Sequence, residues 1–129
     1  MTTITAEDRS GAMLAHLSGY AGYLVPCGGV LLPLVLIFTL KSRTLVAIAK
    51  QALFLNVLGL MTFLFAILAG AQLVFLAQRY PVAYLPVALV GLLGIGVVGL
   101  VLLCPIIGAV KASGGEYFRY PLFGVRQPD

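Results

Sequence analysis

One glycine motif is the part of the sequence whose spacing most resembles a site for chemistry. Gly94, Gly96 and Gly99 form the pattern G-x-G-x-x-G. This pattern binds dinucleotide phosphates when it follows a strand, opens a helix and precedes an acidic residue by about 20 positions. Here it lies inside an apolar run, and no acid follows before Glu116. We therefore interpret these glycines as small residues that let helices pack closely in lipid, and we predict no cofactor.

One histidine and two cysteines are the other candidates for catalysis or metal binding. His16 has no Cys, Asp or Glu at the spacing of a zinc site, so a hydrogen-bonded helix contact or an interfacial position is favoured over catalysis. Cys27 and Cys104 form no C-x-x-C pair and are expected to be small buried residues. No acidic residue lies between Asp8 and Glu116 to act as a general acid or base. The sequence predicts no metal site and no enzymatic activity.

The composition points to lipid as the main solvent of this chain. Its 129 residues are 61% hydrophobic and only 9% charged. A small globular protein has a high ratio of surface to volume and needs far more polar side chains than this to cover it. We therefore exclude a soluble domain, a disordered chain and a secreted disulfide scaffold, and predict an integral membrane protein.

The apolar runs predict an all-α membrane bundle of about four helices, in a single domain over residues 1–129. Each of the two long runs exceeds the ~20 residues that a helix needs to span a bilayer. Thr5 to Asp8 offers a helix start signal in the polar lead. The expected segments are a polar lead over 1–10, a helical hairpin over 11–40, long helices over 44–79 and 82–113, and a cytoplasmic tail over 114–129.

The first apolar stretch is interrupted by Pro26, Cys27, Gly28 and Gly29. One interpretation is a single kinked helix that spans the membrane. The other is two short helices that form a hairpin, either spanning or re-entering on the same side. Proline and paired glycines favour a turn, so the hairpin is preferred.

Basic residues mark the ends of the apolar runs. Positive charge concentrates in cytoplasmic loops, which places the 41–50 loop and the tail in the cytoplasm and Arg79 outside, in a bacterial inner membrane. Charges distributed in this way indicate contact with lipid head groups rather than with nucleic acid. The expected interface anchors are Lys41, Arg43, Lys50, Lys111, Tyr117, Arg119 and Tyr120.

Small residues form a stripe on each long helix. On the first, Asn56, Gly59, Phe63, Ala66 and Gly70 recur at steps of three and four, and on the second lie Gly91, Gly94, Gly96 and Gly99. We expect these faces to pack against other helices, with Asn56 finding a polar partner across a helix interface. The alternative is that Asn56 and Gln72 line a pore.

Both ends of the chain carry a resemblance to a known family. The segments Thr5–Arg9, Met13–Ser18, Ala21–Pro26 and Lys111–Leu122, with Pro33-Leu34, resemble an uncharacterised bacterial family of small membrane proteins, a domain of unknown function. That family is distantly similar to the Tic20-type subunit of the chloroplast inner-envelope import translocon. The resemblance implies about four membrane helices with both ends cytoplasmic, and implies no known activity. After Lys41 this chain departs from the family pattern, which is more polar and acidic there.

These observations favour a non-enzymatic accessory, assembly or scaffold protein that acts through helix–helix association. Its partners would be membrane lipids and another membrane protein or a second copy of the chain. The alternative is a component of a protein-translocation or channel-like assembly.

Overall fold

The computed structural model describes residues 3–25, 27–121 and 124, most of which are helical. In chain order the elements are α1 (Arg9–Leu17), η1 (Ser18–Tyr20), α2 (Ala21–Leu24), α3 (Gly28–Thr39), α4 (Arg43–Arg79), η2 (Pro81–Ala83) and α5 (Tyr84–Ser113). Within these residues the only β pairing is an isolated antiparallel bridge between Thr3 and Glu116. The predicted all-α class with two long apolar helices is confirmed.

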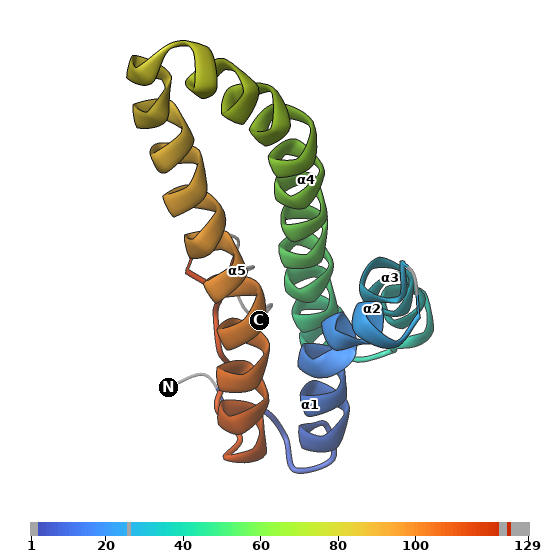
Figure 1. The fold of residues 1–129 in the computed structure, drawn as a ribbon. Coiled ribbons are helices and arrows are strands. Elements are labelled where there is room, and N and C mark those ends of the chain that lie inside the picture. Colours follow the sequence, from blue (N-terminus) through green and yellow to red (C-terminus); the bar gives the residue numbers. More distant parts are fainter. Residues whose placement is uncertain (1–2, 26, 122–123, 125–129) are drawn as a thin grey trace.

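The helices α4 and α5 form a long antiparallel pair that is joined at the top of Figure 1. With 37 residues, α4 is about 55 Å long at the α-helical rise, so it exceeds the ~30 Å core of a bilayer. It ends at Arg79 because Tyr80 precedes Pro81 and takes an extended conformation. The expected helix over 44–79 corresponds to α4, and the one over 82–113 to η2 and α5.

The chain reverses direction between α2 and α3. Cys27 has a φ of 62° and precedes α3, whereas Pro26 lies outside the described residues. Gly19 before the reversal and Gly29 after it both lie against Asn56, roughly a third of the way along α4. From there α3 returns to the beginning of α4, and in Figure 1 α2 and α3 project to one side of the long pair.

The segment Thr5 to Asp8, expected to provide the first turn of a helix, lies before the first helix in the structure. Helix α1 begins at Arg9 and has no acidic residue in its first turn. The Asp8 carboxylate instead accepts a hydrogen bond of 2.8 Å from the hydroxyl of Ser42. Asp8 therefore connects the start of α1 to the loop before α4, which is why its side chain does not cap its own helix.

Most of the buried residues of α4 and α5 lie at one end of the molecule. The buried residues of α4 lie between Leu45 and Leu55, apart from Ala77, and those of α5 between Cys104 and Ala112. We call this end the base: it comprises α1, residues 43–55 of α4, residues 104–113 of α5 and residues 114–120. The far half comprises the rest of α4 and α5, whose large apolar side chains are mostly exposed.

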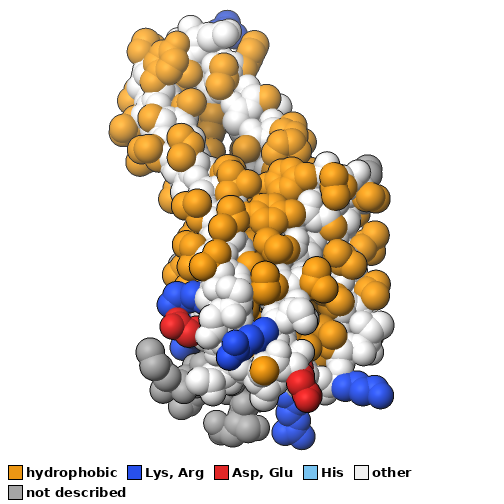
Figure 2. Space-filling model, turned by 90° about the horizontal axis from the view of Figure 1, so that it is seen from below, with side chains coloured by type: hydrophobic (Ala, Val, Ile, Leu, Met, Phe, Trp, Pro, Cys, Tyr) orange, Lys and Arg blue, Asp and Glu red, His pale blue; other side chains and the backbone are white. Residues whose placement is uncertain are grey.

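Charged side chains gather at one end of the molecule in Figure 2, while hydrophobic ones cover much of the surface between that end and the other. The charged residues of the base and its adjoining loops are Glu7, Asp8, Arg9, Lys41, Arg43, Lys50, Lys111, Glu116 and Arg119. The far half has only Arg79. This distribution is the one expected of a helix pair whose middle faces lipid.

Candidate functional site

An apolar cleft lies between α4 and α5 in the far half, and residues of η1, α2 and the start of α3 also line it. Its volume is about 1000 Å³, and Gly59, Ala66 and Gly70 line it from α4, while Gly91 and Gly94 line it from α5. Asn56 lies at the end nearest the base. The stripe expected on α4 and the first two glycines of the stripe expected on α5 therefore face the same space.

The glycines of this cleft mark where the two helices diverge. A Cβ atom added to Gly59 would lie 2.9 Å from Cγ2 of Val101, so α4 and α5 approach closely there. A Cβ added to Gly70, Gly91 or Gly94 would have no atom within 4 Å. Beyond Gly59 the helices are thus too far apart to contact each other through these glycines.

Gly96 and Gly99 differ from the other predicted packing residues. A Cβ on either would also meet nothing within 4 Å, and neither lines the cleft. Within the described residues, only Gly59 of this glycine set makes the close helix contact that was expected. Packing of the others against a second protein stays a prediction.

Asn56 finds its hydrogen-bond partner within its own helix. Its Nδ2 donates to the carbonyl of Ala52 over 2.8 Å. A Cβ on Gly19 would lie 2.3 Å from Nδ2 of Asn56, and one on Gly29 would lie 3.0 Å from Oδ1. Two glycines thus leave the space that the amide occupies, which the sequence stripe on α4 did not reveal. Gln72 is exposed and does not line the cleft.

A polar cluster in the base holds the segment that follows α5. Nε2 of Gln51 donates to the hydroxyl of Tyr117 over 2.7 Å, and its Oε1 accepts from the backbone N–H of Tyr120 over 2.9 Å. Nδ1 of His16 and the Tyr120 hydroxyl are hydrogen-bonded at 3.0 Å. The predicted hydrogen-bonded role of His16 is confirmed.

His16 sits in a close-packed position. A Cβ on Gly108 would lie 2.4 Å from Nδ1 of the ring. Its other nitrogen, Nε2, is buried and has no hydrogen-bond partner among the described residues. The imidazole is therefore held by packing against α5 and by the one bond to Tyr120.

The two tyrosines of this cluster remain neutral. Burial raises the pKa of Tyr117 to about 12, although Arg119 and the hydrogen bond from Gln51 act in the opposite direction. Burial also raises the pKa of Tyr120 well above its usual value. Both hydroxyls thus keep their protons, while the Tyr117 oxygen accepts from Gln51 and the Tyr120 hydroxyl is hydrogen-bonded to His16.

Gln51 was not identified from the sequence, because it stands at the start of an apolar run and resembles an interfacial residue. Its position beside Lys50 gave no signal of a contact with residues so far along the chain. Tyr120 was expected at head-group level, but it is only 2% exposed. Its ring fills space among Leu55, Cys104 and His16, because the chain turns back along the bundle after α5.

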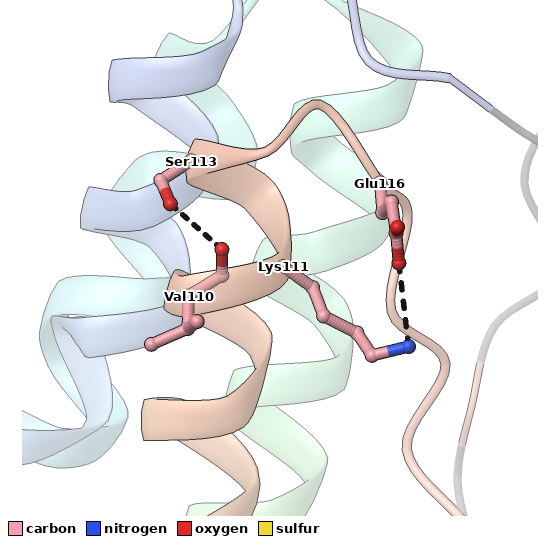
Figure 3. Close-up of polar contacts among 4 residues, drawn as sticks. All are labelled: Val110, Lys111, Ser113 and Glu116. Atoms are coloured by element: carbon pink, nitrogen blue, oxygen red, sulfur yellow. Dashed lines mark hydrogen bonds and ion pairs between the residues drawn. The ribbon is translucent and has the colours of Figure 1, made fainter.

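The basic residues expected as interface anchors lie on the surface of the base or its adjoining loop: Lys41, Arg43, Lys50, Lys111 and Arg119. Lys111 pairs with Glu116 at 3.4 Å, and the nearby hydroxyl of Ser113 donates to the carbonyl of Val110 (Figure 3). Both interactions involve the last turn of α5, and the ion pair joins it to the segment that follows the helix. Leu122, Phe123 and residues 125–129 of the expected tail lie outside the described residues.

Both cysteines are free. Cys104 is buried, as expected, but the expectation was wrong for Cys27, which is exposed because it stands in the turn before α3. In the parts of the chain that the structure describes, no three His, Cys, Asp or Glu side chains form a group that could hold a metal ion.

Comparison with known proteins identifies a family. No curated protein and no solved structure matches the chain. The model of the magnetosome magnetite crystal formation protein family matches residues 7–126. This match supports membership of a membrane protein family, and it does not support the resemblance to the import-translocon subunit. The chain belongs to the magnetosome magnetite crystal formation protein family.

Proposed function

We propose that the protein is a non-enzymatic accessory protein of a magnetosome membrane and takes part in magnetite crystal formation by associating with other membrane helices. The family match supports the setting. The cleft between α4 and α5 supports the mode of action, and it is the single observation on which the proposal rests.

The cleft has the properties of a helix-binding surface in lipid. Small residues allow helix backbones to approach closely, and close approach is what drives association where there is no hydrophobic effect between helices. Gly70, Gly91 and Gly94 meet no atom of their own chain, so their surfaces are available to a partner. The proposed partner is a transmembrane helix of another membrane protein or of a second copy.

A translocation or channel component would need a polar path through the membrane. The side chains lining the cleft are mainly apolar, with Asn56 and Thr62 among its few polar groups. This favours association over transport. We further propose that the base faces the cytoplasm in the bacterial inner membrane or a compartment derived from it, since basic side chains concentrate there.

Two matched glycines of α5 test the association. Gly94 lines the cleft and Gly96 does not, yet neither would crowd its own chain. We expect Gly94→Leu to reduce a homo-oligomer or the recovery of a co-purified partner in mild detergent, and Gly96→Leu to leave both unchanged. A purified wild-type chain that is strictly monomeric and brings down no partner would contradict the proposal.

The role in crystal formation needs a cellular test. The gene is introduced into a magnetite-forming bacterium that lacks its own member of this family, and crystal size is measured by electron microscopy. Restoration by the wild type and its loss with Gly94→Leu would support the proposal. Crystals that stay unchanged on introduction of the wild type would argue against it.

A further inference from the structure

The molecule has different cross-sections in its two halves. Around the base and just above it, α1 packs against α4 and α5 and α3 packs against α4, whereas beyond the reach of these short helices α4 and α5 lie alone (Figure 1). A helix is roughly 10 Å across, so each adds about 80 Å² and the two extra ones together add about 160 Å². The protein is therefore broader at one end.

The extra helices have the surface of lipid-facing segments. α3 contains no charged residue, and its exposed side chains include Leu31, Val35 and Phe38, the last of which is 81% exposed. Leu24 in α2 is 87% exposed. So many large apolar side chains would be costly in water, and they indicate that acyl chains cover them. Lys41, just after α3, marks the return of the chain to the head groups.

The hairpin formed by α1 to α3 reaches only part of the way along the long helices. Gly19 and Gly29 contact Asn56, and the chain reverses direction between them. The remaining part of α4, up to Arg79, has no buried residue other than Ala77. The hairpin therefore enters the leaflet on the side of the base and leaves it on the same side.

We propose that the protein is a wedge that binds preferentially to bilayers in which the leaflet on the side of the base is convex. The occupants of the exposed α2 and α3 surface are the acyl chains of that leaflet. Inserting protein area into one leaflet favours curvature toward that leaflet, as shallow amphipathic helices do. A spanning partner helix in the cleft adds equal area to both leaflets, so it leaves this difference unchanged.

The test measures protein density on vesicles of different size. The purified, fluorescently labelled chain is reconstituted into vesicles of phosphatidylcholine and phosphatidylglycerol, which carry no primary amine, with diameters from about 50 to about 400 nm, because binding of this kind is sensitive to curvature. A membrane-impermeant amine reagent selects molecules whose base faces outward, because the lysines of the sequence are Lys41, Lys50 and Lys111. We expect these molecules to be enriched by about threefold on the smallest vesicles.

Two sets of exposed residues provide variants with opposite expected effects. Replacing Leu31, Val35 and Phe38 by alanine narrows the broad end, and should reduce the enrichment. Replacing Leu68, Phe75 and Leu92 by alanine narrows the far half, and should increase it. All six side chains are at least half exposed, so neither set removes core packing, and circular dichroism checks that the helices persist.

Two results would overturn the wedge. One is a density of outward-facing molecules that does not depend on vesicle diameter, as expected if a second copy of the chain covers α3. The other is a change of the same sign in both triple variants. Neither result depends on whether the cleft binds a partner helix, so this proposal and the proposed function fail separately.

Discussion

At the scale of single residues, the base depends on a few hydrogen bonds between distant parts of the sequence. Gln51 satisfies one side-chain and one backbone group of the returning segment, and His16 bonds the Tyr120 hydroxyl. Buried polar groups cost free energy when they lose a partner, because they were desolvated on folding. Each of these side chains should thus contribute measurably to the stability of the base.

Tyr120→Phe tests the bond to His16. The variant keeps the ring but leaves both imidazole nitrogens without a partner among the described residues, where Nε2 already has none. We expect the free energy of unfolding to fall by about 1–3 kcal/mol, measured by thermal or denaturant unfolding in detergent micelles. Tyr84→Phe, at an exposed position, is the control and should change little. Equal effects of the two variants would show that the bond is not stabilising.

The raised pKa of Tyr117 predicts a loss of stability in alkaline solution. The pKa is about 12 in the folded protein, against about 10 for a tyrosine in an unfolded chain. The folded state keeps a proton that the unfolded state releases, so stability is complete below pH ~10 and is lost as the pH rises toward ~12. Unfolding measured across this range should show the decline, and Tyr117→Phe should make it shallower. A wild-type stability that rises in this range would contradict the assignment.

At the scale of the elements, α4 and α5 contact each other through different residues along their length. At Gly59 the partner helix is close, with Val101 against the glycine, whereas at Gly70 the space is open. The same residue type therefore has two roles on one helix. Both glycines line the cleft, but Gly59 packs against Val101 whereas Gly70 faces open space.

This pair gives a matched prediction. Gly59→Leu forces a large side chain against Val101 and should lower the free energy of unfolding by about 1–3 kcal/mol. Gly70→Leu should change stability by less than about 0.5 kcal/mol, because the side chain enters open space. Unfolding in micelles measures both. Strong destabilisation by Gly70→Leu alone would mean that the two helices close together in the membrane.

At the scale of the whole molecule, the two ends differ in how many charged side chains they carry. Basic and acidic side chains surround the base, and Arg79 stands alone at the far end. Because positively charged loops stay in the cytoplasm, the base should face the cytoplasm and the turn at Arg79 the opposite side.

Arg79→Lys makes this orientation measurable with a conservative change. The wild-type lysines are confined to the base and its adjoining loop, so intact spheroplasts should protect them from an impermeant amine reagent. The new lysine at position 79 should react from outside. If the wild type is labelled in intact spheroplasts and the variant gains no further label, the orientation is the opposite of the one predicted.

Several features followed directly from local composition. The scarcity of charge predicted a membrane protein, and the lengths of the apolar runs predicted two long helices, because a helix in lipid satisfies its own backbone and needs only a continuous apolar surface. These are properties that neighbouring residues determine among themselves. A hydrogen bond was one of the expectations for His16, but its partner, Tyr120, could not be named from the sequence.

Tertiary structure alone decided which small residues pack and which remain open, and which tail residues are buried. Gly59 and Gly70 share one stripe, yet only the divergence of α5 separates their environments. From the sequence, Tyr120 is expected to be a head-group anchor. In the structure the chain turns back after α5, and Tyr120 bonds to Gln51 and His16 instead. Contacts of this kind join positions far apart in the sequence. Whether they form depends on how the helices are placed in space, which local sequence patterns do not determine.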